Sequence, residues 1–568
     1  MGDLTQKKTF FGHPPGLFTL FFTEMWERFS YYGMRAILIL FMVASLAEKN
    51  AGMGLDTATA GAIYGLYTAG VYLLTLPGGW LADNIFGQRK AIWYGGVIIM
   101  LGHISLAIPQ DVTFYLGLVL VCIGTGLLKA NISTIVGDLY PEGGARRDAG
   151  FSIFYMGINI GSFLGQLVVG ILGENWNWHW GFGAAAVGMF LGLVVYRLTA
   201  DRYLGDIGVT PKAKEAAKNS DGSATTSTGL LIGLVALLVL FIVVLQLTGI
   251  IDMRSIVGVA EGMGYIIIAI VALYFAYILI AGGLNKAEKL KVVVIIFLFI
   301  GAALFWSGFE QAGSSLNLFA ERHTDRMFQA NGLSGIVAIV VGLAVLLGLG
   351  GLWVKEILNR DDLIDALKII TAIVVAGLAA FAWWLVDSIG KGWEMPASWL
   401  QSVNPMFIIL LAPVFGALWV KLAQRNMNPS APLKFGFGLI CLGLGFLVMV
   451  FAARAVVAEL PETVRVSTLW LVMTYFLHTT GELTLSPVGL SMTTKLAPKK
   501  FGGQMMGIWF IGAALGNLIA GLFAGNFDEN NTAQMPDLFM SVVMTSVGAG
   551  IIFLILSPWI KRWMGDVE

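Results

Sequence analysis

The chain has 568 residues, of which 57% are hydrophobic and only 12% are charged. A soluble globular chain carries about 25% charged residues, so most of this chain must face lipid, and recurring long apolar runs indicate a polytopic membrane protein instead of an anchored soluble domain. The formal net charge is zero, which removes any electrostatic case for nucleic-acid binding.

The first predicted helix, residues 15–46, carries an unusual set of polar side chains. Helical spacing by three and four residues places six of them on one face: Glu24, Glu27, Arg28, Tyr31, Tyr32 and Arg35. A polar face on a helix of membrane length must look into protein or a water-filled cavity. The sequence therefore predicts a cavity beside this helix.

Sixteen apolar segments are predicted to form helices. Their approximate residues are 15–46, 58–82, 91–109, 113–136, 150–172, 180–198, 228–250, 262–282, 291–314, 333–354, 364–387, 404–423, 434–455, 467–491, 502–525 and 538–560. Helices inserted in pairs keep the later spans in their original orientation. We therefore predict an N-terminal six-helix bundle (1–200), a linker with an inserted helix pair (201–285) and a C-terminal six-helix bundle (286–565), which includes an extra hairpin at 331–390.

The orientation follows from the distribution of lysine and arginine between short loops. One side of the predicted membrane carries many of these residues: Lys7, Lys8, Arg89, Lys90, Arg146, Arg147, Lys286, Lys289, Lys421, Arg425, Lys495, Lys499, Lys500, Lys561 and Arg562. Loops on the other side, such as 173–179 and 526–537, have none. Both termini are therefore predicted to lie in the cytoplasm.

Few ionisable residues lie well inside the predicted spans. Apart from the four charges of the first helix, they are Lys129, Glu310 and Glu482. Each costs roughly 2.5–3.5 kcal/mol at the bilayer centre, so these groups must pair, hydrate or protonate. Static salt bridges that fix helix register are one explanation. Because the charges fall in both halves of the chain, a central site with exchangeable partners is the favoured alternative, and such carboxylates can carry protons.

Several motifs connect the chain to a known family. The segment from Glu24 to Gly33 resembles the ExxERFxYYG signature of proton-dependent oligopeptide transporters, a branch of the major facilitator superfamily. Other segments resemble further marks of that family: GWLADNIFGQRK (79–90), GTGLLKANIS (124–133), FSIFYMGINIG (151–161), Phe305-Trp306 with Glu310-Gln311, Gly481-Glu482 with SPVG (486–489), and 504–509. The resemblance implies an all-α polytopic membrane protein with the superfamily's six-plus-six helix bundles.

The same resemblance implies roles for individual residues. The proton-coupling group is expected to be Glu24, Glu27, Arg28, Arg35, Lys129 and Glu310. The substrate-binding group is expected to be Arg28, Tyr32, Arg35, Tyr72, Lys129, Asn159, Glu310, Asn404, Glu482, Ser486 and Trp509. Asp83 and Arg89 are expected to stabilise the cytoplasmic closure.

The expected function is proton-coupled import of di- and tripeptides by alternating access. A dipeptide is a zwitterion, so a basic wall of Arg28, Arg35 and Lys129 opposite an acidic wall of Glu310 and Glu482 would suit it. No cofactor is expected, since the proton is the coupling ion. We further expect a functional monomer in the bacterial cytoplasmic (inner) membrane, with peptides, protons and lipid as partners.

The chain departs from the family pattern in three places. Gly65 follows Tyr64 where some relatives carry a histidine, which shifts proton handling toward the carboxylates. Phe309 stands where many bacterial members have a second acid, and Ala130 stands where proline is usual.

Three other functions remain as alternatives. A related carrier for nitrate or another small solute is the nearest, but a second acidic wall gains nothing for an anion. An integral-membrane enzyme would need a nucleophile–base pair or a metal cluster, and the sequence shows no HExxH, Asp-rich or Cys/His motif. A channel would show repeated filter segments, and none is visible.

Overall fold

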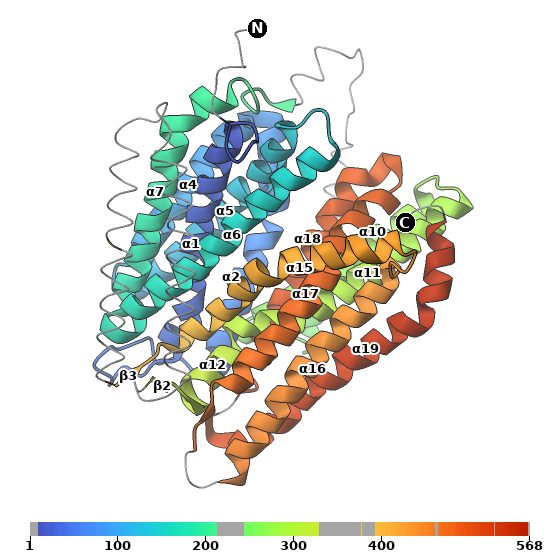
Figure 1. The fold of residues 1–568 in the computed structure, drawn as a ribbon. Helices are drawn as coiled ribbons and strands as arrows, with labels where there is room; N and C mark the ends of the chain where they lie inside the picture. Colours follow the sequence, from blue (N-terminus) through green and yellow to red (C-terminus); the bar gives the residue numbers. More distant parts are fainter. Residues whose placement is uncertain are drawn as a thin grey trace.

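The computed structural model describes residues 9–212, 243–328, 392–459, 464–527 and 529–565, together with Gly377. Within these ranges the protein is almost entirely helical, and the helices fall into two groups. Figure 1 shows the blue-to-teal helices of the first group beside the orange and red helices of the second. We refer to these groups as the N-terminal half (α1–α7) and the C-terminal half (α11–α19).

The N-terminal half is built around α1, which packs against both α6 and α7, while α4 packs against α5. Its elements are α1 (Gly16–Val43), α2 (Thr57–Leu73), α3 (Thr75–Leu81), the π-helical turn η2 (Ala82–Phe86), α4 (Gln88–Leu106), α5 (Asp111–Asp138), α6 (Gly144–Gly170), the π-helical turn η3 (Ile171–Trp176) and α7 (Trp178–Leu204). The apolar residues of α1 make this helix buried along nearly its whole length. The polar face of the first predicted helix thus lies inside the protein.

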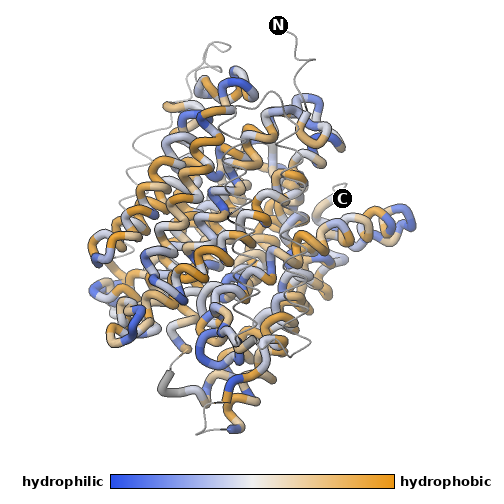
Figure 2. The backbone as a smooth tube through the Cα atoms, turned by 60° about the vertical axis from the view of Figure 1, so that its left-hand side comes forward, coloured by the Kyte–Doolittle hydropathy of each residue, from blue (hydrophilic) through white to orange (hydrophobic). Residues whose placement is uncertain are grey.

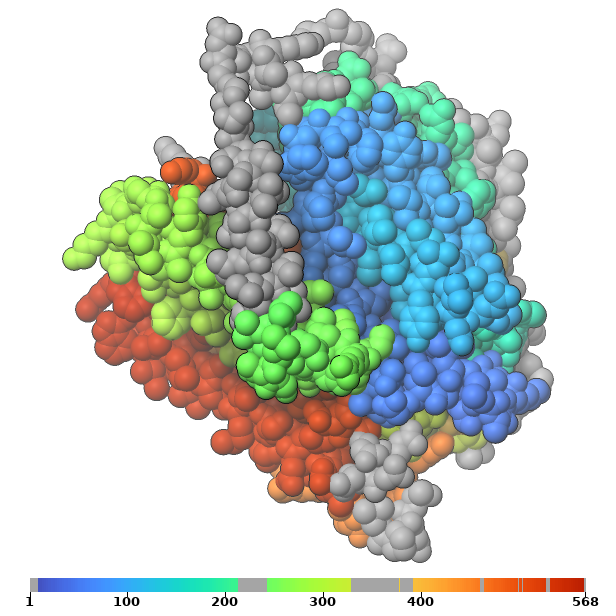
Figure 3. Space-filling model, turned by 180° about the vertical axis from the view of Figure 1, so that it is seen from behind, coloured from blue at the N-terminus to red at the C-terminus, as the bar shows by residue number. Residues whose placement is uncertain are grey.

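In the C-terminal half, α16 packs against both α17 and α19. Its helical elements are α11 (Lys286–Phe309), the 3-10 helix η4 (Glu310–Gly313), α12 (Ser315–His323), the 3-10 helix η5 (Ala397–Ser402), α15 (Val403–Gln424), α16 (Ala431–Ala458), α17 (Leu469–Leu496), η6 (Lys499–Phe501), α18 (Gly502–Ala524), η7 (Glu529–Gln534) and α19 (Met535–Met564). Before this half comes α10 (Ile256–Ala281), which contacts α2, α11 and α18. From behind, green α10 residues lie between the blue and red parts of the chain (Figure 3).

Two short sheets complete the described structure. Strand β1 (Thr324–Asp325) pairs in parallel with β4 (Val466–Ser467), and β2 (Met327–Phe328) pairs antiparallel with β3 (Trp393–Glu394). They tie the segment after α12 to the segments before α15 and α17.

Most predicted helical segments are confirmed. The segments 333–354 and 364–387, and with them the extra hairpin at 331–390, lie outside the described residues apart from Gly377, and only the end of 228–250 is described. Two predicted helices are more broken than expected. The second is interrupted at Leu74, which lies between α2 and α3. The helix predicted at 291–314 starts earlier and passes through a 3-10 turn at Glu310 before continuing to His323.

The helices suit a membrane. Among the described residues, 10 helices are long and apolar enough to cross one. Figure 2 shows hydrophobic stretches along the middle of the helices and hydrophilic residues gathered toward the ends. The chain is therefore a multi-pass membrane protein, as its composition predicted.

The two halves touch closely where α2 meets α18. A Cβ atom added at Gly61 would lie 2.4 Å from the backbone oxygen of Gly521, and one added at Gly521 would lie 2.4 Å from the Cα of Gly65. Such contact is closer than any side chain allows, so the backbones approach only because these residues are glycines. A histidine in place of Gly65 would already meet the Leu518 oxygen at 2.9 Å with its Cβ.

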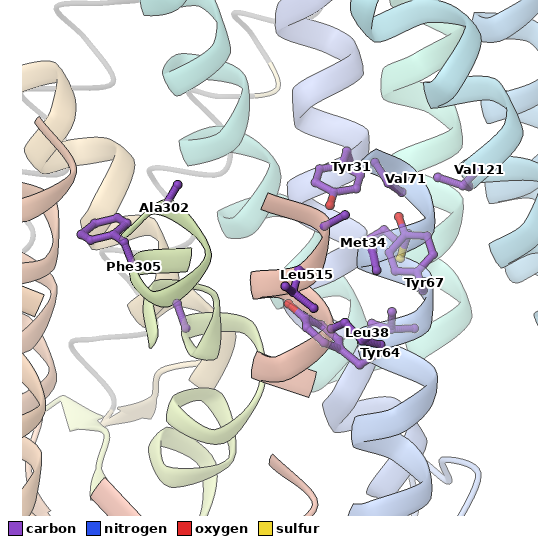
Figure 4. Packing of buried hydrophobic residues seen from close by; sticks show 14 of the residues in the cluster. Tyr31, Met34, Leu38, Tyr64, Tyr67, Val71, Val121, Ala302, Phe305 and Leu515 are labelled. Carbon is purple, nitrogen blue, oxygen red and sulfur yellow. The ribbon is translucent and has the colours of Figure 1, made fainter. Parts of the chain in front are cut away.

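Apolar packing surrounds this contact. Met34 and Leu38 of α1 lie beside Tyr67 and Tyr64 of α2, and Leu515 of α18 approaches them from the other half (Figure 4). All five are buried. The interface between the halves is thus closed where α2 meets α18, by both the glycine contacts and the large side chains.

Candidate functional site

A cavity of about 1680 Å³ lies between the two halves. Its lining extends to residues at helix ends: Asp138 at the end of α5, Arg147 near the start of α6, Lys495 near the end of α17 and Lys561 near the end of α19. Since α1 begins and α19 ends at this same side, the cavity opens toward the side of the two chain termini. We call this opening the mouth and the opposite end of the interface the closed end.

The wall from the N-terminal half contains a compact charge cluster on α1. The Nε atom of Arg28 donates a hydrogen bond to Glu24 Oε1 at 2.8 Å and lies 2.5 Å from Glu27 Oε2. All three side chains are almost fully buried. Arg28 therefore pairs with two carboxylates at once, so the cluster has one more carboxylate than cations. A proton or a further cation can neutralise this excess acid.

Lys129 of α5 provides the next cation on this wall. Its ammonium group lies 3.7 Å from the centre of the Tyr72 ring, close enough for a cation–π interaction. It forms no salt bridge with any residue that the structure describes. Since Lys129 lines the cavity, its charge is available to an anionic group of a ligand.

One ion pair crosses between the halves. Nη1 of Arg35 donates to Glu310 Oε2 at 2.5 Å, and both residues are buried. Glu310 is the first residue of the 3-10 turn that interrupts the helix after α11, and this break places it opposite α1. The guanidinium of Arg35 also lies 5.2 Å from the Tyr32 ring centre. This pair therefore helps to hold the halves together on the closed side of the cavity.

The wall from the C-terminal half presents Glu482 of α17. Its Oε2 accepts a hydrogen bond from Nδ2 of Asn404 at 3.2 Å, and the same amide donates to Thr479 Oγ1 at 2.9 Å. Among the described residues no cation pairs with this carboxylate. Glu482 is only 9% exposed, so a buried acid faces the cavity with an amide as its main partner.

Every residue that the sequence assigned to substrate binding lines this cavity. They are Arg28, Tyr32, Arg35, Tyr72, Lys129, Asn159, Glu310, Asn404, Glu482, Ser486 and Trp509. Their positions are thus known, while their roles stay predictions. Of the proton-coupling group, Glu24 lines the cavity but Glu27 does not, because it is buried behind Arg28.

The residues of the two expected walls differ in whether their charges are already paired. A basic wall of three cations was expected opposite an acidic wall of two carboxylates. In the structure Arg35 and Glu310 neutralise each other, so neither charge is free. Lys129 on one wall and Glu482 on the other face the cavity without a salt bridge to a described residue, while Arg28 is shared by its own carboxylates.

The two residues assigned to the cytoplasmic closure lie near the mouth. Arg89 pairs with Asp201 and donates a hydrogen bond to the backbone oxygen of Gly205 at 2.7 Å, so it connects the start of α4 to the end of α7. Asp83 lies in η2, and its Oδ1 is buried without a hydrogen-bond partner among the described residues. In this conformation Arg89 stabilises the N-terminal half itself and makes no bridge to the described residues of the other half.

Some lining residues were not anticipated. They include Tyr155, Gln166, Trp306, Gln401, Trp419, Lys434 and Tyr475. Tyr155 could have been found, because it precedes Asn159 by four residues on the same face of α6. Trp306 also lies in a segment that resembles the family. The remaining residues carry no signal in the sequence, since polar and aromatic residues are also common in packed helix interfaces.

Comparison with known proteins gives consistent results. The sequence model of the POT family matches residues 89–347 and 375–539. A peptide transporter of Yersinia enterocolitica is 38% identical over 568 residues, which covers 99% of this chain and 97% of that protein. A di-/tripeptide transporter of Lactococcus lactis subsp. cremoris is 35% identical and is covered to 99%.

A solved structure also matches. The crystal structure of a peptide transporter POT in complex with sulfate superposes with a TM-score of 0.75 at 37% sequence identity, covering 99% of this chain and 100% of that one. The arrangement of the helices into two halves is therefore the arrangement of that transporter.

Proposed function

This chain belongs to the POT family, and we propose that it is a proton-coupled symporter that imports di- and tripeptides by alternating access. It is a transport protein and not an enzyme, as its family is a family of peptide transporters. Proton coupling and the preference for short peptides are the parts that belong to the proposal.

The observation that carries the proposal is that Lys129 and Glu482, a cation and a carboxylate with no salt bridge to a described residue, line the cavity from opposite halves. A free peptide has an ammonium group at one end and a carboxylate at the other. Glu482, which has no described cation partner, suits the ammonium group, and Lys129 suits the carboxylate. Tyr32, Asn159 and Trp509 line the space between and would accept varied side chains. Sites at the interface of the two halves are typical of secondary transporters.

The coupling proton would act on the carboxylates that hold the halves and the charge cluster together. Protonation of Glu310 would remove the charge that holds Arg35, and the closed end could then open. Glu24 and Glu27 compete for Arg28, so a proton on either one leaves a balanced pair. One proton supplies about 2.3 kcal/mol per 100 mV of membrane potential.

The orientation completes the proposal. Loops on the mouth side carry the lysines and arginines, which places this side in the cytoplasm together with both termini. The conformation would then be open to the cytoplasm and closed to the outside. We place the protein in the bacterial cytoplasmic membrane as a monomer with no cofactor.

The test is transport by the purified protein in liposomes. Dialanine uptake is measured with and without an inward proton gradient and a negative interior potential. We expect accumulation only when a driving force is present. Absence of peptide uptake would refute the substrate, and uptake that ignores both gradient and potential would refute the coupling. Nitrate as a competitor tests the alternative of a small-anion carrier, which is disfavoured because Glu482 would repel an anion.

A further inference from the structure

We propose that Glu174 is a positioning residue of the closed end, and that its carboxylate must release the start of α15 before the cavity can open to the other side. The proposal rests on the proposed alternating access. It adds a gate contact that lies outside the cavity and that a bound peptide cannot reach, because Glu174 is not among the lining residues.

Both oxygens of the Glu174 carboxylate are used in a contact between the halves. Oε2 accepts a hydrogen bond from the backbone N–H of Ala397 at 2.7 Å, and Oε1 accepts one from the N–H of Ser398 at 3.0 Å. Ala397 and Ser398 are the first residues of η5, which continues into α15. The first N–H groups of a helix have no intrahelical partner, and a carboxylate is their favoured acceptor.

The N-terminal half holds Glu174 in place. It lies in η3, directly after α6, where Asn50 donates hydrogen bonds from Nδ2 to the backbone oxygens of Gly173 at 2.7 Å and Glu174 at 3.2 Å. Asn50 is itself held by Trp178, whose Nε1 donates a hydrogen bond to the backbone oxygen of Asn50 at 2.8 Å. The carboxylate is therefore fixed to one half while its two donors belong to the other.

Neutral hydrogen bonds surround this contact. Nε1 of Trp399 donates to the Leu167 oxygen at 2.8 Å, and the amides of Asn317 and Gln401 both donate to the Ala36 oxygen. Charge-assisted hydrogen bonds are roughly twice as strong as neutral ones. Among these contacts between the two halves, those of Glu174 are the charge-assisted ones and should be the strongest.

Loss of the Glu174 contact should shift the population of the protein from the closed toward the opened conformation. Every bond that exists only in the closed conformation favours it, and removing one shifts the equilibrium toward the opened form. In Glu174→Gln the side chain keeps its length but offers one acceptor oxygen and turns an NH₂ group toward a backbone donor. We expect the ratio of opened to closed protein to rise by about tenfold, which is about 1.4 kcal/mol.

The experiment measures distances across the closed end. Spin labels are placed at Leu46→Cys and Leu469→Cys, two exposed positions on opposite halves at this end, after the buried Cys122 and the partly buried Cys441 are replaced by alanine. Double electron–electron resonance then gives the distribution of distances between the two spin labels, measured without peptide or proton gradient. We expect a longer-distance population in Glu174→Gln. The control is Glu48→Gln, an exposed glutamate of the same end, which should leave the distribution unchanged.

A second variant removes the donor instead of the acceptor. Ala397→Pro deletes the N–H that binds Glu174, and proline is tolerated at the first position of a helix because that N–H has no intrahelical partner. If the two residues act through one contact, the double variant should show no larger shift than the stronger single variant. Additive shifts, or an unchanged distribution in Glu174→Gln, would overturn the proposal. If the Ala397→Pro variant does not fold, the distance distribution of Glu174→Gln alone decides whether the proposal holds.

These outcomes are independent of the substrate. Distances are read without peptide, so a liposome experiment that refuted peptide uptake would leave them unaffected. Conversely, an unchanged distance distribution would leave the proposed function intact and refute only the role of Glu174.

Discussion

The two walls of the cavity differ in how their charged side chains are neutralised. On the N-terminal wall, Arg28 is shared by Glu24 and Glu27 within one helix, so most charge is balanced internally. On the C-terminal wall, Glu482 has the amide of Asn404 and no cation among the described residues. Of the buried carboxylates that line the cavity, only Glu482 forms no salt bridge with a residue that the structure describes.

This difference suggests a division of labour. A buried carboxylate without a cation is costly, and the arrival of an ammonium group offsets that cost. The C-terminal wall is therefore suited to selecting the substrate. The N-terminal cluster has no such need, and its excess acid can take up a proton with or without a peptide in the cavity. Variants on each wall should separate these two roles.

The largest effect is expected at Glu27. Glu27→Gln removes the excess acid of the N-terminal cluster and leaves Glu24 as the partner of Arg28. Proton-driven accumulation of dialanine in liposomes should be lost, while counterflow exchange, which needs no net proton movement, should persist. Glu24→Gln should behave in the same way, since it removes the other acid.

The control is Glu142→Gln, an exposed partner of Arg146 near the mouth, which should transport normally. Full accumulation in both cluster variants would remove the coupling role from this wall. Loss of counterflow together with accumulation would show that the cluster is needed for binding, which contradicts the division between the walls.

The second effect is expected at Glu482. Glu482→Gln keeps the shape and the bond to Asn404 but removes the charge that suits an ammonium group. A hydrogen bond to a charged group is worth roughly 1.5–3 kcal/mol, so dipeptide affinity should fall at least about tenfold. Equilibrium binding of the purified protein measures this directly.

The substrate provides the matched control for this variant. An N-acetylated dipeptide has no ammonium group, so its affinity should be the same for Glu482→Gln and the unmodified protein. An equal loss for both ligands would mean that Glu482 shapes the cavity and does not recognise the amino terminus.

The positions of these residues show how far the sequence can be read. Apolar length predicted the helices, and the spacing of polar residues predicted the buried face of α1. The six residues of that face spread over an arc of about 140° at 3.6 residues per turn. In the structure the arc is divided, so that Glu24, Arg28, Tyr32 and Arg35 line the cavity and Glu27 is buried behind them.

Other features depend on tertiary packing and leave no local signal. The partners Arg35 and Glu310 are separated by 275 residues, and their pairing needs the 3-10 turn that breaks the helix at Glu310. Glu174 lies in a loop that the sequence distinguishes only by its lack of basic residues. Its partners are backbone N–H groups, which every non-proline residue possesses. Contacts of this kind are visible only in three dimensions.

A smaller effect is expected at Asn404, which supports Glu482. Asn404→Ala removes the hydrogen bonds to Glu482 and to Thr479, but Thr479 keeps its bond to the backbone oxygen of Tyr475. Dipeptide affinity should fall by about threefold to tenfold, because one hydrogen bond is worth about 0.5–1.5 kcal/mol. Combined with Glu482→Gln, the loss should be less than additive. Additive losses would mean that Asn404 contacts the peptide by itself.

The smallest effect is expected at Tyr72, which lies against Lys129, a cation of the N-terminal wall that forms no salt bridge with a described residue. The Tyr72 ring lies beneath the Lys129 ammonium group and directs it, and a cation–π interaction is worth about 0.5–2 kcal/mol. Tyr72→Phe keeps the ring and should leave dipeptide affinity within about twofold, whereas Tyr72→Leu removes it and should weaken binding by about threefold to fivefold. Equal losses in both variants would assign the effect to the hydroxyl group. The two walls would then differ in hydrogen bonding as well as in charge. The Tyr72 hydroxyl group would be the functional polar group on one wall, and the Asn404 amide would be the functional polar group on the other.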